Sequence, residues 1–352
     1  MNGNKKKVVL AIILIVVLAG LSMAMIYAFF PMAGERTPTI AKLDLTLPKG
    51  TTISSASGYG DMIVLCGYNE SLYVQGMQAF FLLSYSPGDV GFQKHSVQIN
   101  YIPMDGTRTS LNVINGSLYL EYTAARGGDY TSYNTYLKEI HVNNWTLGEE
   151  VRVKIPPLLE PGVSVSDGKN LYIIGGVSSN ITQPYLPFIL TDDVYRINVT
   201  TGQTHLMATI PNASGMHGVF LGGKLITLFR AGDFNGPEQN FLSSVLWNST
   251  AICDLDNGTV FYPPETRSLS TPGTVPSADG SAAYFFNPMN TTSDQWNYTH
   301  KILRMDAGGS LSKVDLLLPD PIQYVIPIHY DRGFFLISMG PFEGTTFWRC
   351  TL

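Results

Sequence analysis

The sequence predicts an all-β protein, a six-bladed β-propeller preceded by one transmembrane helix. A strand–turn–strand plan recurs six times at a period of roughly fifty residues, as it does in propeller blades. An uncharged run of 23 residues follows three lysines near the N-terminus. No helical periodicity of useful length appears after that run, so strands and turns are expected for the rest of the chain.

The N-terminal run is expected to anchor the chain in a membrane. As a helix, residues 8–30 would be roughly 34 Å long at about 1.5 Å per residue, which spans a bilayer. Three lysines at 5–7 would keep the preceding end in the cytoplasm. The predicted order is a cytoplasmic tip (1–7), a signal anchor (8–30), a linker (31–38) and an extracellular or lumenal propeller (39–352). The alternative is a cleaved signal peptide, with small-residue sites near Ala24 or Ala33, and a secreted protein.

Each repeat opens with two apolar strands around a turn of Gly, Asp or Asn. The second strands are marked by residues 46, 53, 54, 58 and 52 positions apart, namely Leu72, Leu118, Leu171, Leu225, Ala283 and Phe335. In the first repeat this places the opening strand at 62–66 and its turn just before Leu72. Third strands are expected at 80–85, 136–141, 193–198, 251–255 and 301–305. Asn-Gly and Gly-Gly turns lead into fourth strands. Seven blades are the alternative count.

The two ends of the propeller region complement each other. Residues 40–47 alternate between apolar and polar and belong to no repeat, while the last repeat stops one strand short. We therefore expect the N-terminal strand to become the outer strand of the last blade. Such closure hides sheet edges that would otherwise pair with other chains.

Three segments carry a family resemblance. Residues 170–176 combine a strand with Gly175 and Gly176, residues 193–203 form a third strand and turn, and Tyr136 and Trp145 have a characteristic spacing. The chain resembles the kelch-repeat propellers of the galactose oxidase/kelch superfamily. Residues 72–76 and 80–85 are similar to fungal membrane-anchored kelch proteins. Two features depart from the pattern, because one blade alone keeps both glycines and Thr204 stands where a tryptophan is expected.

Composition and motifs restrict the classes of function. A net charge of −5 without a basic stripe disfavours nucleic-acid binding. Cys66, Cys253 and Cys350 lie in apolar strand patterns, which favours buried free thiols, with a Cys66–Cys350 bridge as the alternative.

Ten glycosylation sequons follow the membrane run and agree with an extracytoplasmic body, although Asn is also common in turns. They begin at Asn69, Asn115, Asn144, Asn180, Asn198, Asn212, Asn248, Asn257, Asn290 and Asn297.

The sequence predicts no catalytic residues, no metal and no cofactor. The resemblance implies copper radical oxidases, whose site needs two histidines, tyrosines and a cysteine crosslinked to a tyrosine. His217 and His329 fall on expected innermost strands, but no cysteine stands beside a candidate tyrosine ligand. Acidic residues lie mostly in turns, and hydrolase elbows, phosphate loops and zinc spacings are missing. A degenerate galactose-oxidase-like or glycosidase-like carbohydrate enzyme is the alternative.

A binding face is the favoured prediction. The long loops between second and third strands should share one face with the connections between blades, and aromatic and Arg side chains on such loops are common binding anchors. The candidates are Arg126, Asp129, Tyr130, Tyr133, Tyr185, Arg230, Asp233, Phe234, Glu238 and Trp296. Glycans at residues 69, 115, 144, 198 and 257 are expected on the opposite face. We expect non-catalytic recognition of a protein or glycan at the cell surface, with a structural cell-surface glycoprotein as a further alternative.

Overall fold

The computed structural model shows an all-β, six-bladed propeller. It describes residues 38–69, 80–97, 109–125, 133–155, 160–178, 189–210, 213–231, 246–264, 269–270, 273–277, 280–286, 289–290, 297–319, 324–330, 333–340 and 344–352. Residues 40–351 form one compact unit. The described residues include no helix long and apolar enough to cross a membrane, and the expected anchor at 8–30 lies outside them.

The first three blades follow one another along the chain. Blade 1 contains β2 (Thr51–Tyr59), β3 (Met62–Asn69), β4 (Phe80–Tyr85) and β5 (Gln93–Ser96). Blade 2 contains β6 (Thr109–Ile114), β7 (Ser117–Ala125) and β8 (Tyr133–His141), with β9 (Thr146–Leu147) and β10 (Val151–Arg152) sharing the outer position. Blade 3 contains β11 (Glu160–Ser166), β12 (Leu171–Ser178), β13 (Ile189–Ile197) and β14 (Thr204–Thr209).

The last three blades complete the ring. Blade 4 contains β15 (Ala213–Leu221), β16 (Lys224–Ala231), β17 (Leu246–Asp254) and β18 (Thr259–Phe261). Blade 5 contains β20 (Gly273–Pro276), β21 (Ala282–Phe286), β24 (Lys301–Asp306) and β25 (Leu311–Leu317). Blade 6 contains β26 (Tyr324–Tyr330), β27 (Gly333–Gly340), β28 (Gly344–Thr351) and β1 (Thr39–Leu43). A small separate sheet joins β19 (Leu269–Ser270), β22 (Met289–Asn290) and β23 (Asn297–Tyr298).

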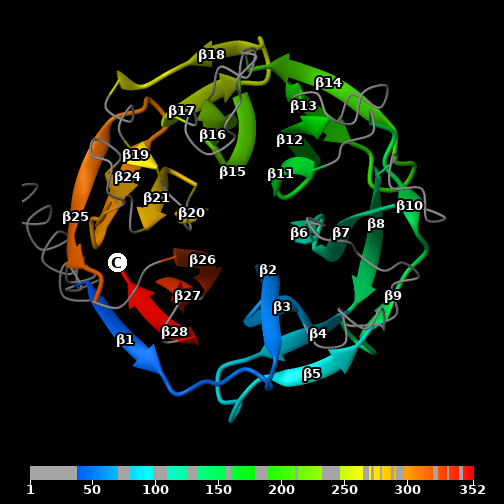
Figure 1. The fold of residues 1–352 in the computed structure, drawn as a ribbon, viewed down its shortest axis with the longest axis vertical. Coiled ribbons are helices and arrows are strands. Elements are labelled where there is room, and N and C mark those ends of the chain that lie inside the picture. Colours follow the sequence, from blue (N-terminus) through cyan, green and yellow to red (C-terminus); the bar gives the residue numbers. More distant parts are fainter. Residues whose placement is uncertain are drawn as a thin grey trace, which may run out of the picture. The chain divides into compact units, whose positions relative to one another are not determined.

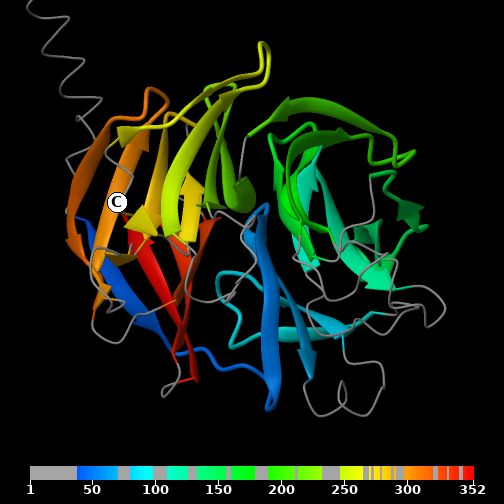
Figure 2. The ribbon, with the colours of Figure 1, turned by 45° about the horizontal axis from the view of Figure 1, so that its top comes forward.

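The blades close into a ring around a central axis (Figure 1). The innermost strands touch their neighbours in the cyclic order β2, β6, β11, β15, β20, β26 and back to β2. Strand β1 pairs with β28 as the outer strand of blade 6, so the predicted closure by the N-terminal strand is confirmed. The oblique view in Figure 2 shows β1 and β28 side by side, next to the C-terminal end.

The first blade differs from its predicted register. Residues 62–66 were expected to be its innermost strand, but they belong to the second strand, β3. The innermost strand is β2, which pairs with β3 through a turn at Tyr59–Met62. The second strand is therefore marked by Ile63 rather than Leu72, and Ile63 lies 55 positions before Leu118, close to the other spacings. Leu72 itself lies outside the described residues.

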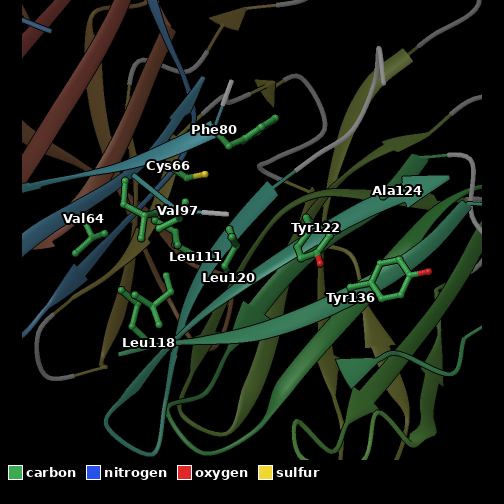
Figure 3. Packing of buried hydrophobic residues seen from close by; sticks show 12 residues of the cluster. Val64, Cys66, Phe80, Val97, Leu111, Leu118, Leu120, Tyr122, Ala124 and Tyr136 are labelled. Carbon is green, nitrogen blue, oxygen red and sulfur yellow. The ribbon is translucent and has the colours of Figure 1, made fainter. Parts of the chain in front are cut away.

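Apolar side chains fill the seams between blades. One cluster joins blades 1 and 2 and includes Val64, Leu82, Leu118, Tyr122 and Tyr136. Figure 3 shows members of this cluster on neighbouring strands, with Cys66 among them. All three cysteines are buried and free, as predicted, so the alternative Cys66–Cys350 bridge does not form. Burying such side chains is the main force that holds the blades together.

Candidate functional site

The strand directions divide the connections between two rims of the propeller. Consecutive strands of the described blades run antiparallel. First-to-second and third-to-fourth strand turns therefore leave from one rim, here called the turn rim. Second-to-third strand loops and the links between blades leave from the other, the loop rim. The shared face that we expected for the long loops is this loop rim.

Two of the ten predicted ligand-binding residues lie in the part of the chain that the structure describes, at the loop-rim ends of their strands. Tyr133 and Arg230 have described backbone positions, in β8 and β16. The other eight lie outside the described residues, namely Arg126, Asp129, Tyr130, Tyr185, Asp233, Phe234, Glu238 and Trp296. Their role in binding stays a prediction.

Four sequon asparagines lie on the turn rim of blades 2, 3 and 4. Asn115 is in the β6–β7 turn, Asn144 in the β8–β9 turn, Asn198 between β13 and β14, and Asn257 between β17 and β18. All four are exposed. The placement of Asn69 beside them was wrong. It ends β3, which runs away from the Tyr59–Met62 turn, so Asn69 lies at the loop rim.

Two of these sequons have the same local geometry. The Asn144 Oδ1 accepts hydrogen bonds from the Thr146 backbone N–H (3.3 Å) and hydroxyl (2.7 Å). The Asn257 Oδ1 accepts the corresponding bonds from Thr259, at 2.9 and 2.7 Å. These are Asx turns, so turn formation alone accounts for asparagine at both positions. The remaining sequons at Asn180 and Asn212 lie outside the described residues, as do the side chains at Asn248, Asn290 and Asn297.

The two histidines considered as metal ligands lie on innermost strands, as predicted. His217 belongs to β15 and His329 to β26. The His329 ring meets the Phe334 ring edge-on, with centroids 6.0 Å apart. Within the described part of the chain, no group of three or more potential metal-binding side chains comes together.

A hydroxyl cluster that the sequence reasoning missed joins the innermost strands of blades 1 and 2. A bulge in β2 between Ile53 and Ser55 directs two successive serines toward blade 2. Ser54 shares a 2.6 Å hydrogen bond with the Thr109 hydroxyl, and Ser55 shares one of 3.2 Å with the same group. Burial raises the pKa of the neighbouring Cys66 thiol, and the hydroxyls offset part of that rise. A raised thiol pKa favours the protonated form over the thiolate, which is the reactive form.

A second polar cluster lies between blades 2 and 3 and contains a buried acid. Glu121 in β7 is 4% exposed, and its Oε2 accepts a hydrogen bond from the Ser164 hydroxyl of β11. Ser110 of β6 is its cross-strand partner and accepts a 3.0 Å bond from the Asn112 amide. Burial raises the pKa of Glu121 to about 7, although the Ser164 bond lowers it.

The arrangement around Glu121 suits hydrogen bonding rather than paired-carboxylate chemistry. Glycosidases place a second carboxylate several ångströms from the first, whereas the described partner of Glu121 is a hydroxyl. A signal for this residue was present in the sequence, because an acid interrupts a second strand, residues 118–124, whose other members except Thr123 are apolar or aromatic. Buried carboxyls with shifted pKa values are frequent at functional sites.

A further contact joins blades 1 and 2 at their outer strands. The His95 ring of β5 stacks on the Trp145 ring of the β8–β9 turn, with centroids 3.8 Å apart and planes inclined by 7°. Ser84 shares a 2.8 Å hydrogen bond with His95 Nε2. Burial lowers the pKa of His95. Trp145, the middle residue of the Asn144 sequon, therefore also has a structural role.

Comparison with known proteins identifies the fold. No protein-family model matches the chain, and no curated protein sequence is similar to it. The solved structure of YjhT covers 88% of this chain and 97% of its own, with a TM-score of 0.58 at 11% identity. Hydrazine synthase of Kuenenia stuttgartiensis covers 85% of this chain and 83% of its own, with a TM-score of 0.48 at 12% identity. At 11% identity the likeness to YjhT shows the propeller fold alone, and the kelch resemblance of the sequence stays a prediction.

Proposed function

We propose that this chain is a membrane-anchored, extracytoplasmic glycoprotein whose propeller recognises a protein or a glycan without catalysis. One observation carries the proposal, namely a closed ring whose second-to-third strand loops all leave from the loop rim. Loops on a rigid scaffold commonly hold binding residues. The predicted anchor at 8–30 and the sequons support the location, and secretion after signal cleavage remains its alternative.

The test uses the soluble fragment 39–352, which retains β1 and the compact unit. It would be applied to a glycan array and used to capture proteins from intact cell surfaces. We expect a ligand whose binding weakens at least about tenfold, or about 1.4 kcal/mol, in Tyr133→Ala or Arg230→Ala. Lys313→Ala, on the exposed outer strand of blade 5, is the control. If neither assay detects a ligand, the result would count against recognition. Binding that stays unchanged in Tyr133→Ala and Arg230→Ala would favour the structural glycoprotein.

A carbohydrate-active enzyme is the second candidate, because of Glu121. A buried carboxyl with a pKa of about 7 has the property that a general acid needs. That candidate predicts hydrolysis of a glycoside, lost in Glu121→Gln, or copper in the purified protein by elemental analysis. Recognition without catalysis predicts neither result.

A further inference from the structure

A buried acid lies in the seam between the inner parts of blades 2 and 3. Glu121 belongs to the second strand of blade 2, and its hydroxyl partner Ser164 belongs to the innermost strand of blade 3. The contact therefore joins two blades rather than two strands of one sheet. Nearby, the Ser166 hydroxyl donates a 2.8 Å bond to the Val113 carbonyl of β6, so two serines of β11 bind blade 2.

The described groups around the Glu121 carboxyl are uncharged. Strand β6 contributes Ser110 and Asn112 on this side, and β8 contributes Leu137, the cross-strand partner of Glu121. The apolar cluster of this seam includes Leu137, Leu171 and Ile173. Other titratable residues of these sheet faces lie at other rungs, namely Tyr119, Glu139 and His141 in blade 2 and Asp193 and Tyr195 in blade 3. The side chains of Tyr133 and Glu160 lie outside the described part of the chain. The causes of the Glu121 shift are burial and the Ser164 bond, with no charged neighbour among them.

We propose that Glu121 makes the seam between blades 2 and 3 a proton-dependent contact, which the neutral carboxyl closes and the carboxylate loosens. A neutral carboxyl fits a seam of hydroxyl, amide and apolar groups. An ionised one is desolvated there, with one hydroxyl as its described partner, which is costly. Opening the seam would hydrate the charge, so ionisation favours the open arrangement.

The direction of the pH effect follows from the raised pKa. The folded seam holds its proton up to about pH 7, whereas an open or unfolded chain releases it near the ordinary value of 4.5. The free energy that Glu121 contributes to the closed seam between blades 2 and 3 is therefore fully present below about pH 4.5. It is lost progressively as the pH rises from there through about 7. Between pH 5.5 and 7.5, the linkage relation predicts a roughly twentyfold increase in the opening equilibrium.

Hydrogen–deuterium exchange on the full chain tests the proposal. Peptides covering β7 and β11 would be followed at pH 5.5 and 7.5, with rates corrected for intrinsic exchange. We expect their protection to fall roughly twentyfold at the higher pH, while β17 and β27 change little. Glu121→Gln, which stays neutral, should remove the difference. Glu149→Gln, an exposed acid between β9 and β10, is the matched control and should keep it.

Two further measurements apply if Glu121→Gln fails to fold. Carboxyl titration in the unaltered protein, by carbon-13 NMR of labelled glutamate, should show one group near pH 7. In Ser164→Ala that titration should move to higher pH, because the bond that favours the carboxylate is lost. Glutamates that all titrate below pH 5.5, or a pH difference that survives in Glu121→Gln, would overturn the proposal.

Discussion

Asp167 shows how one side chain shapes a turn between strands. In the β11–β12 turn, its Oδ1 accepts bonds from the backbone N–H groups of Lys169 (2.8 Å) and Asn170 (2.6 Å). Its Oδ2 accepts bonds from the Asn170 amide and the Tyr172 hydroxyl. Burial alone would raise the pKa of Asp167, but these donors together hold it below its ordinary value.

Replacing Asp167 should therefore destabilise the propeller. We expect Asp167→Ala to lower the free energy of unfolding by about 1–2 kcal/mol at pH 7, because two backbone donors lose their partner. The loss should shrink as pH falls below about 3.8, since a depressed pKa stabilises the fold only where the carboxylate is ionised. Urea unfolding measures it. Asp256→Ala, in an exposed turn, is the control, and equal effects for both variants would contradict this account.

Gly58 illustrates a second residue-scale constraint, the close approach of innermost strands. A Cβ at Gly58 would lie 2.6 Å from the His329 carbonyl oxygen across the seam between blades 1 and 6. Backbone is difficult to displace, so Gly58→Ala should cost about 1–3 kcal/mol. Thermal unfolding would show it. Gly91→Ala, where a Cβ would meet open space, should have little effect. An unchanged unfolding temperature in Gly58→Ala would mean that the seam between blades 1 and 6 can widen freely.

At the scale of elements, the sequence was informative wherever strands are apolar. The predicted third strands at 80–85 and 301–305 agree with β4 and β24, and closure by the N-terminal strand was also predicted correctly. The apolar strand pattern did not predict β2, because residues 51–59 are mostly hydroxyl-bearing or small and do not alternate between apolar and polar. Those same serines form the cluster with Thr109, so the missing strand and the missed polar cluster have one cause. The partners of Glu121 could not be predicted, since they lie on a different blade.

Strand β1 is the element whose removal should be most damaging for its size. It has five residues and is mostly exposed. Leu43 at its end, and Leu45 and Leu47 in the segment that follows it, pack against the cluster between blades 6 and 1. The Lys42 ammonium also lies 5.8 Å from the Trp348 ring centre. Without β1, the β28 edge loses its partner and becomes available to other chains.

A fragment starting at residue 48 should therefore be less stable than the fragment 39–352 and prone to association. Losing three half-buried leucines alone should cost roughly 3 kcal/mol. Thermal unfolding and light scattering of the two fragments, at matched concentrations, make the comparison. Equal stability and a monomeric state for both fragments would show that β1 is not needed for closure.

At the scale of the whole molecule, ring closure brings distant parts of the chain together. The first strand, β1, and the last strand, β28, pair within blade 6. The next strand along the chain, β2, belongs to blade 1 and contacts β26 of blade 6. Six blades could be predicted because each repeat contributes one apolar core strand. The number of repeats was therefore correct even though the strands of the first blade were assigned wrongly. The predicted membrane topology depends instead on residues outside the described ring, and this prediction can be tested independently of any ligand.

Synthesis of the full chain in the presence of microsomes tests that topology. We expect the body to enter the lumen, since three lysines retain the N-terminal side and an uncharged segment of 23 residues is long enough to span the bilayer. The body should then resist added protease and gain mass that an N-glycosidase removes. Replacing Lys5, Lys6 and Lys7 by Glu should lower the protected fraction, whereas Lys42→Glu, on the propeller, should not. A body that is digested without detergent and carries no glycan would contradict the anchor, and a protected body released by alkaline extraction would instead indicate a cleaved signal peptide.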